Sequence, residues 1–169
     1  MITNNISYTG SVKVKLLKGK RVKRTYTIHN EGTQLLFQGI ALSLIQSESS
    51  KLLPNYIAIG LEGGELSDSY RLLNEIVRVP ITSKNVLSNT FIDPQHGQMS
   101  DGYKAIFSAT IPASSLSENT IREIGLFGQS SGDNLLARIT PPINDPIVVE
   151  TGMSITIEWT TLIKNGYKE

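Results

Sequence analysis

The chain has 169 residues, of which 39% are hydrophobic and 18% are charged, a composition typical of one globular domain with its own core. It contains no cysteine, which excludes disulfides, thiolate chemistry and cysteine-bound zinc and is typical of folding in a reducing cytoplasm. The net charge of +1 conceals an asymmetry, because the first 30 residues hold seven basic residues and no acidic residue, which leaves −6 on the remainder.

The first ten residues, MITNNISYTG, predict an extended N-terminal arm that has too few apolar groups to fold alone. The arm lacks the apolar segment of a signal peptide, and no apolar run in the chain approaches the roughly 20 residues needed to cross a bilayer. We therefore expect neither signal-directed export nor a membrane partner. Residues 11–169 are expected to form a single domain.

Residues 11–28 predict a basic antiparallel hairpin, because two runs of alternating apolar and polar residues flank a Lys-Gly-Lys turn. Four cations are expected to share its solvent face: Lys13, Lys15, Arg21 and Lys23. This face could simply be solvated, or it could bind an acidic patch on a partner protein. Nucleic acid is the third choice, since only Tyr8 and Tyr26 are near enough to stack on bases.

The rest of the chain predicts one helix followed by many short strands. Residues 29–32 predict a turn, and apolar residues at spacings of three and four predict a helix near residues 33–46. The predicted strands are 55–61, 70–81, 86–92, 103–112, 120–127, 135–139, 147–150 and 153–163, divided by Gly, Pro, Asn and Ser tracts. This pattern is typical of a mainly β fold, either a sandwich or a barrel, and we expect an antiparallel, jelly-roll-like β-sandwich with one helix.

No residue pattern predicts a catalytic centre, a cofactor site or a metal site. The best cation candidate is the loop with Asp93, His96 and Asp101, although these residues are also the normal composition of a solvated turn. His29 is expected in a turn, and neither a G-x-S-x-G elbow nor a phosphate-binding loop is present. We therefore expect a protein that is not an enzyme and uses no cofactor.

Two carboxylates stand on predicted strands, each close in sequence to an arginine. Glu75 and Glu123 could act together in glycoside hydrolysis, but nothing in the sequence places them at the required separation of about 5–10 Å. We expect instead that Glu75 pairs with Arg78 and Glu123 with Arg122, so that each pair holds a strand in register.

Four stretches then follow in a distinctive order: PNYIAIG (54–60), LLNEIVRVPI (72–81), ENTIREIGLFG (118–128) with LLARI (135–139), and IVVETGMSITIEWTTLI (147–163). Their content and order resemble small virion structural proteins of tailed bacteriophages, which occur in tails, baseplates and fibre attachments. The matching positions are Pro54, Tyr56, Ile57, Gly60, Glu75, Arg78, Asn119, Ile121, Glu123, Gly125, Leu126, Phe127, Gly152, Ile155, Ile157 and Trp159. The basic hairpin is not part of the resemblance.

The resemblance implies a non-enzymatic structural component of a phage particle, in the tail or the fibre-attachment region. It implies synthesis in the bacterial cytoplasm, a place in the virion, three or six copies, and contacts with identical subunits and with tail, portal, neck or capsid proteins. Glu75, Arg78, Arg122 and Glu123 would then form ion pairs that repeat around a ring. The alternatives are a head-decoration or head-fibre-anchoring protein and, from another class, a carbohydrate-binding host-recognition module. The last is disfavoured by an aromatic content of 7%.

Overall fold

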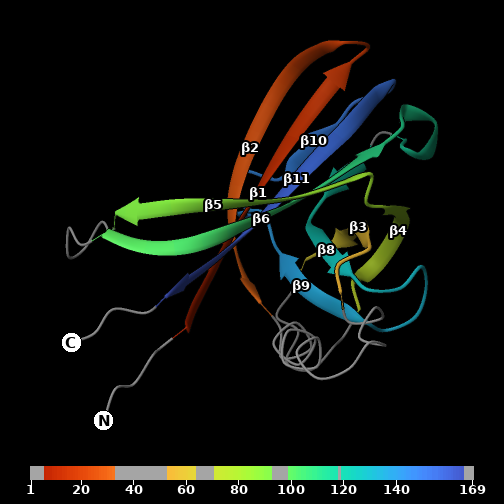
Figure 1. Ribbon diagram of the computed structural model, residues 1–169. Coiled ribbons are helices and arrows are strands. Elements are labelled where there is room, and N and C mark those ends of the chain that lie inside the picture. Colours follow the sequence, from red (N-terminus) through yellow and green to blue (C-terminus); the bar gives the residue numbers. More distant parts are fainter. Residues whose placement is uncertain (1–5, 33–52, 64–70, 93–98, 118, 166–169) are drawn as a thin grey trace.

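The computed structural model describes residues 6–32, 53–63, 71–92, 99–117 and 119–165 (Figure 1). Within these ranges the regular structure consists of β-strands and one 3-10 turn at Ala113–Ser115. The strands are β1 Ile6–Lys18, β2 Arg21–Gly32, β3 Tyr56–Glu62, β4 Leu73–Pro80, β5 Ser83–Ile92, β6 Met99–Ile111, β7 Asn119–Ile121, β8 Glu123–Phe127, β9 Leu135–Ile139, β10 Ile147–Val149 and β11 Met153–Asn165. The prediction of a mainly β, antiparallel chain is confirmed, whereas the predicted helix near residues 33–46 lies outside the described residues.

Nine of the strands form one sheet in the order β4-β3-β8-β9-β2-β1-β11-β6-β5, and β7 pairs with β10 separately. β2 connects two halves of this sheet. It pairs with β1 along most of its length, while its last residues, Glu31 and Gly32, pair with Arg138 and Ala137 of β9. We call β2-β1-β11-β6-β5 the long half and β4-β3-β8-β9 the short half. In Figure 1 the short half lies at the lower right of the long strands.

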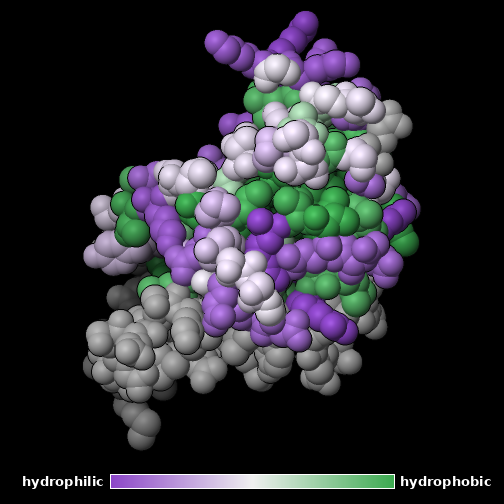
Figure 2. All heavy atoms as spheres, turned by 90° about the vertical axis from the view of Figure 1, so that its right-hand side faces the viewer, coloured by the Kyte–Doolittle hydropathy of each residue, from purple (hydrophilic) through white to green (hydrophobic). Residues whose placement is uncertain are grey.

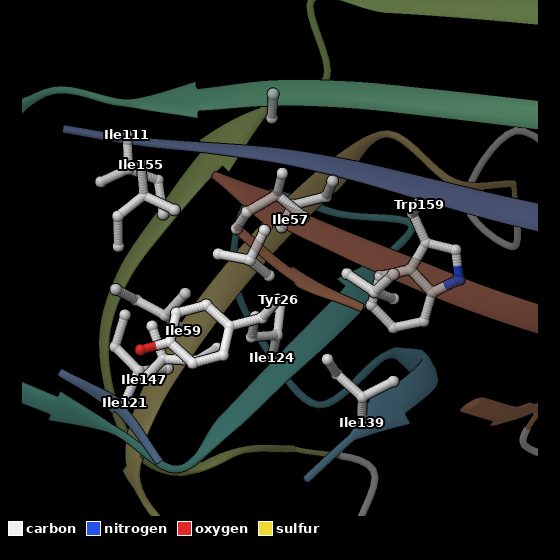
Figure 3. Packing of buried hydrophobic residues seen from close by; sticks show 14 of the residues in the cluster. Tyr26, Ile57, Ile59, Ile111, Ile121, Ile124, Ile139, Ile147, Ile155 and Trp159 are labelled. Atoms are coloured by element: carbon white, nitrogen blue, oxygen red, sulfur yellow. The ribbon is translucent and has the colours of Figure 1, made fainter. Parts of the chain in front are cut away.

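A buried apolar cluster lies between the two halves (Figure 3). Strand alternation builds it, because every second residue of a strand points to the same face. On the long half, the register aligns Val14 of β1, Ile157 of β11 and Ala109 of β6, and all three are buried. The side chains that join them from the short half include Ile57, Ile59, Ile124, Leu126 and Ile139. Trp159, the single tryptophan, is fully buried in this cluster.

Two local predictions differ from the structure at the ends of the first hairpin. Residues 29–32 were expected to form a turn, but they continue β2, where His29 pairs with Ser11. Residues 6–10, assigned by the sequence to an extended arm, form the first part of β1 and pair with the end of β11 from Ile6 opposite Asn165 onward. Main-chain pairing explains both differences, since hydrogen-bonding partners on β1 and β11 hold polar sequences extended.

Two hairpins extend away from the short half. The β1–β2 hairpin reaches the top of Figure 1, and the β5–β6 hairpin reaches its left side. Hydrophilic side chains gather at the top of the molecule in Figure 2, over the tip of the β1–β2 hairpin. In the part of the chain that the structure describes, no helix combines the length and the apolar composition of a membrane span.

Candidate functional site

The face of the short half that points away from the main core carries two Glu–Arg ion pairs. The register places Ala58 and Gly60 of β3 on this face, opposite Gly125 and Glu123 of β8. It also places Arg138 of β9 opposite Gly125. Small residues therefore line the middle of the face, and long charged side chains lie across them.

Glu75 and Arg78 form the first pair, and a bulge in β4 makes it possible. In a regular strand, residues three apart point to opposite faces. Ile59 of β3 lies opposite Val77, whereas Gly60 lies opposite Glu75, so Ile76 is an extra residue on β4. The extra residue reverses the alternation, and Glu75 thereby joins Arg78 on one face. Two parallel bonds link them, from Nε to Oε1 at 2.9 Å and from Nη2 to Oε2 at 2.7 Å.

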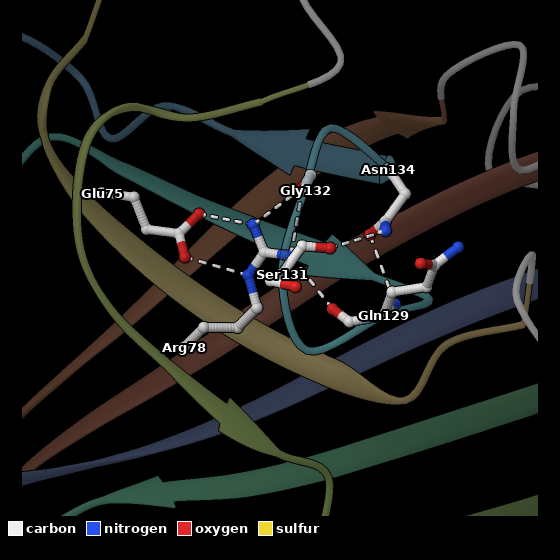
Figure 4. A network of polar contacts seen from close by, with 6 residues as sticks. All are labelled: Glu75, Arg78, Gln129, Ser131, Gly132 and Asn134. Atoms are coloured by element: carbon white, nitrogen blue, oxygen red, sulfur yellow. Dashed lines mark hydrogen bonds and ion pairs between the residues drawn. The ribbon is translucent and has the colours of Figure 1, made fainter.

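Arg78 also binds the loop between β8 and β9, residues 128–134 (Figure 4). Its guanidinium lies 3.6 Å from the centre of the Phe127 ring, and Nη1 donates to the Gln129 carbonyl at 3.0 Å. Both terminal nitrogens lie 3.3 Å from the Gly132 carbonyl. The loop is further closed by Asn134, whose Oδ1 accepts from the Gln129 N–H. With 7% of its side chain exposed, Arg78 is a structural anchor of the loop.

Glu123 and Arg138 form the second pair. The Glu123 side chain has no exposed surface, and its Oε2 accepts from Arg138 Nη1 at 3.4 Å. Its other oxygen, Oε1, is buried without a hydrogen-bond partner among the described residues. The carboxyl fits into the sheet because Gly60 has no side chain. A Cβ on Gly60 would lie 2.5 Å from Glu123 Oε1 and 2.7 Å from the Leu73 carbonyl oxygen.

Burial changes the acidity of this carboxyl. The pKa of Glu123 is raised from 4.5 to about 7, mainly by loss of solvent and to a smaller extent by the nearby charge of Glu62. The Arg138 guanidinium and the Leu73 backbone N–H lower the pKa but do not offset the desolvation. Because a charged carboxylate without full hydrogen bonding is costly inside a protein, the neutral form is favoured at mildly acidic pH.

The structure brings together some of the charged residues that the sequence singled out and separates others. Glu75 and Arg78 pair within β4. Glu123 does not pair with its neighbour Arg122, since adjacent strand residues point to opposite faces, and its partner is Arg138 across the sheet. Arg122 is exposed. Arg138, which lies on the predicted strand 135–139, was not among the expected partners of Glu123.

The candidate cation loop lies mostly outside the described residues. Asp93 and His96 belong to the undescribed segment 93–98, while Asp101 is part of β6. Across the described ranges, no group of three or more His, Cys, Asp or Glu residues is arranged to hold a metal ion.

The basic hairpin contains a bulge that redistributes its charges. Leu16 pairs with Arg24 but Leu17 pairs with Val22, so Lys23 is the extra residue on β2. Alternation places Lys13 and Lys15 on one face of β1, together with Leu17 and therefore Val22. Val22 is exposed as a result.

Arg21 does not share the face of Lys13 and Lys15, because it pairs with Lys18 on the opposite face. Arg24 lies on the core side, 4.6 Å above the Tyr26 ring, and its Nη2 binds Asp145 at 2.7 Å. The predicted face of four cations is thus reduced to Lys13 and Lys15, with Lys23 in the bulge beside them.

Comparisons of the chain with protein-family models, with curated proteins and with solved structures found no match.

Proposed function

We propose that this protein is a non-enzymatic structural component of a bacteriophage particle, in the tail or fibre-attachment region. In this proposal an antiparallel β-sandwich is formed by the long and short halves and the core between them. The protein is synthesised in the bacterial cytoplasm and enters the virion through contacts with identical subunits and with other virion proteins.

The observation that carries the proposal is a set of contacts between different stretches of the chain. These are the stretches that resemble small virion structural proteins. Gly60, from the first stretch, leaves the space that the Glu123 carboxyl of the third stretch occupies. Arg78, from the second stretch, stacks on Phe127 of the third. The resembling residues thus form one connected arrangement in neighbouring strands, as expected if the resemblance is one of fold rather than of isolated short motifs.

The chemistry of these residues supports a structural role. Glu75 is bound by two nitrogens of Arg78, whose remaining donors bind loop carbonyls. Glu123 has no exposed surface from which it could act on a substrate. Carboxylates for glycoside hydrolysis must flank a bound sugar, and neither of these two is available for that. Their pairs instead fix strand and loop positions, as a subunit with repeated protein contacts requires.

The β1–β2 hairpin supplies the proposed contact with an acidic partner surface. Lys13 and Lys15 share a face, Lys23 lies in the adjacent bulge, and Arg21 lies at the tip. Exposed charges of one sign attract an oppositely charged partner over a distance set by ionic strength.

The test is incorporation into particles of a variant with Lys13, Lys15, Arg21 and Lys23 all changed to Glu. Lys13, Arg21 and Lys23 are exposed and Lys15 is half-buried, so the variant should fold, as circular dichroism would verify. Its copy number in purified particles should fall, and the matched change of all four residues to Gln should give an intermediate loss. Normal incorporation of the Glu variant would contradict the hairpin contact. Absence of the unaltered protein from particles would contradict the structural role itself.

A further inference from the structure

β5 is the last strand of the long half, and in the described part of the chain it has a partner strand on one side only. It pairs with β6 over ten consecutive residues, from Ser83 opposite Ser108 to Ile92 opposite Met99, and the register has no shift. Among the described residues, no strand pairs with its other edge. Its outward N–H and C=O groups therefore form a long, regular ladder to which another extended backbone can pair.

This edge lacks the features that normally prevent strand addition. β4, at the opposite end of the sheet, has a bulge at Ile76, a positive φ of 50° at Asn74 and a terminal Pro80. β5 has neither a proline nor a bulge, and its single charged side chain, Lys84, donates to Asn55 Oδ1 at 2.6 Å. Val86 and Leu87 are 69% and 50% exposed on opposite faces of this strand. β5 is therefore open to pairing on both chemical and steric grounds.

Strand direction and charge decide which strand would pair with it. A second open edge exists in the described part of β2, where β9 covers only Glu31 and Gly32. Since all neighbours from β2 to β5 are antiparallel, β2 and β5 run in the same direction. Joining β5 of one copy to β2 of another, with the short halves of both copies on the same side of the sheet, would therefore be parallel and less stable.

Pairing β2 with β2 of a second copy, like pairing β5 with β5, is antiparallel about a two-fold axis. The charges on the strands distinguish these two pairings. Pairing β2 with β2 of a second copy sets two strands side by side that each carry three cations, Arg21, Lys23 and Arg24, and this concentration of like charge is unfavourable. Pairing β5 with β5 brings together serine, asparagine, valine and leucine side chains, with the Lys84 ammonium turned toward Asn55. Charge thus favours β5.

We propose that β5 is the self-association edge, and that two copies join β5 to β5 antiparallel about a two-fold axis. The two long halves then form one continuous sheet, and Val86 and Leu87 of each copy lie near those of the other. This inference specifies a contact between identical subunits, and it rests on the homo-oligomeric part of the proposed function alone.

The absence of native cysteine allows a direct test by single substitutions. Asn85→Cys, Val86→Cys, Leu87→Cys and Ser88→Cys are each made and oxidised in the purified full chain. In a two-fold antiparallel pair, the distance between a residue and the same residue of the other copy increases with the residue's distance from the axis. Disulfide dimers should therefore peak at one of the four positions and decline on either side of it. Thr25→Cys on β2 tests the rival edge, and Val148→Cys on β10, an exposed site, measures random collision.

A charge-swap experiment tests the pairing without a covalent bond. Leu87→Lys and Leu87→Glu each place like charges beside one another in the dimer, so each variant alone should dimerise at least about tenfold more weakly than the unaltered chain. An equimolar mixture of the two should recover dimers, because opposite charges then meet across the axis. Leu87→Gln, which is polar but neutral, should stay closer to the unaltered chain. Analytical ultracentrifugation measures each dissociation constant.

Equal cross-linking at positions 85–88 and at Val148→Cys would overturn the inference, as would stronger cross-linking at Thr25→Cys. A mixture of Leu87→Lys and Leu87→Glu that stays monomeric when the unaltered chain dimerises would also overturn it. An unaltered chain that is monomeric at millimolar concentration overturns it as well. None of these results concerns particle incorporation, so failure here is distinguishable from failure of the proposed structural role.

Discussion

Glu123 is a buried acid whose Oε2 accepts from Arg138 at 3.4 Å. Its pKa is raised to about 7, mainly by burial. The folded protein therefore holds a proton on this group at a pH where the unfolded chain has already released it. Folding stability should accordingly be highest below about pH 4.5, decrease as the pH rises toward 7, and level off above that, as far as this residue is concerned.

Glu123→Gln should remove this pH dependence, because an amide can still accept from Arg138 but does not titrate. Between pH 4.5 and 7.5 the free energy of unfolding of the unaltered protein should fall by up to about 3 kcal/mol relative to that of the variant. Urea unfolding followed at several pH values measures the difference. Glu150→Gln, at an exposed position, is the control and should follow the unaltered protein. Parallel curves for Glu123→Gln and the unaltered protein would show that the carboxyl is not the source.

The sequence alone could not identify Arg138 as the partner of Glu123. Alternation alone says that Arg122 and Glu123 point apart, which rules out their pairing within a regular strand. Choosing Arg138 requires the register of β8 against β9, where Gly125 lies opposite Arg138 and the pairing shifts between Leu126 and Phe127. Register depends on turn geometry and on packing from elsewhere in the chain, neither of which is visible in local sequence.

At the scale of the element, Arg78 attaches the β8–β9 loop to β4. One side chain joins three segments, because it binds Glu75, stacks on Phe127 and binds the carbonyls of Gln129 and Gly132. A planar guanidinium can make these contacts together, whereas the compact ammonium of lysine cannot.

Arg78→Lys should therefore destabilise the protein by about 1–3 kcal/mol and loosen the loop. Amide hydrogen exchange should accelerate at residues 129–134 more than in β3 or β8. Arg24→Lys is a matched control, because the Arg24–Asp145 pair is more than half exposed on both sides and should contribute under about 1 kcal/mol. Equal losses in the two variants, with unchanged exchange in the loop, would mean that Arg78 does not anchor it.

Element positions were largely predictable, and the exceptions have a common origin. Runs of apolar residues between turn-forming tracts located the strands from β3 to β11, although the stretch 120–127, predicted as one strand, is divided into β7 and β8. The sequence reading failed for the face expected to hold Lys13, Lys15, Arg21 and Lys23, which the bulge in β2 divides, and at 29–32, which is strand rather than turn. Bulges in β2 and β4 reverse the alternation, and pairing with neighbours keeps polar residues extended. Both effects depend on contacts between strands and are not visible in the local sequence.

At the scale of the whole molecule, the core cluster contains side chains from both halves of the sheet. Trp159 belongs to β11 of the long half, while Ile124 and Ile139 belong to the short half and lie in the same cluster (Figure 3). Neither half can therefore lose its structure without exposing apolar surface of the other. A single domain over the described residues should behave as one cooperative unit.

Thermal or urea unfolding should accordingly give one transition, with Trp159 fluorescence and far-ultraviolet circular dichroism changing together. The fluorescence signal has a single source, since the chain contains one tryptophan. Ile124→Ala changes only the short half, yet it should shift both signals equally and reduce stability by about 2–5 kcal/mol. Separate transitions, or a shift in circular dichroism alone, would show that the two halves unfold independently.

The pairing of β1 with β11 has a consequence for the order of events during synthesis. The ladder joins Ile6 to Asn165 and Lys18 to Met153, so β1, which lies between β2 and β11, finds its second neighbour only at the far end of the described chain. The ribosome makes β1 first, and until residues 153–165 have been translated its edge stays open beside the basic β2 hairpin. Contacts so distant in sequence form slowly. A chain stalled before β11 should therefore expose Val12, Val14 and Leu16 to chaperones, and folding of the long half should be completed late in translation or after it.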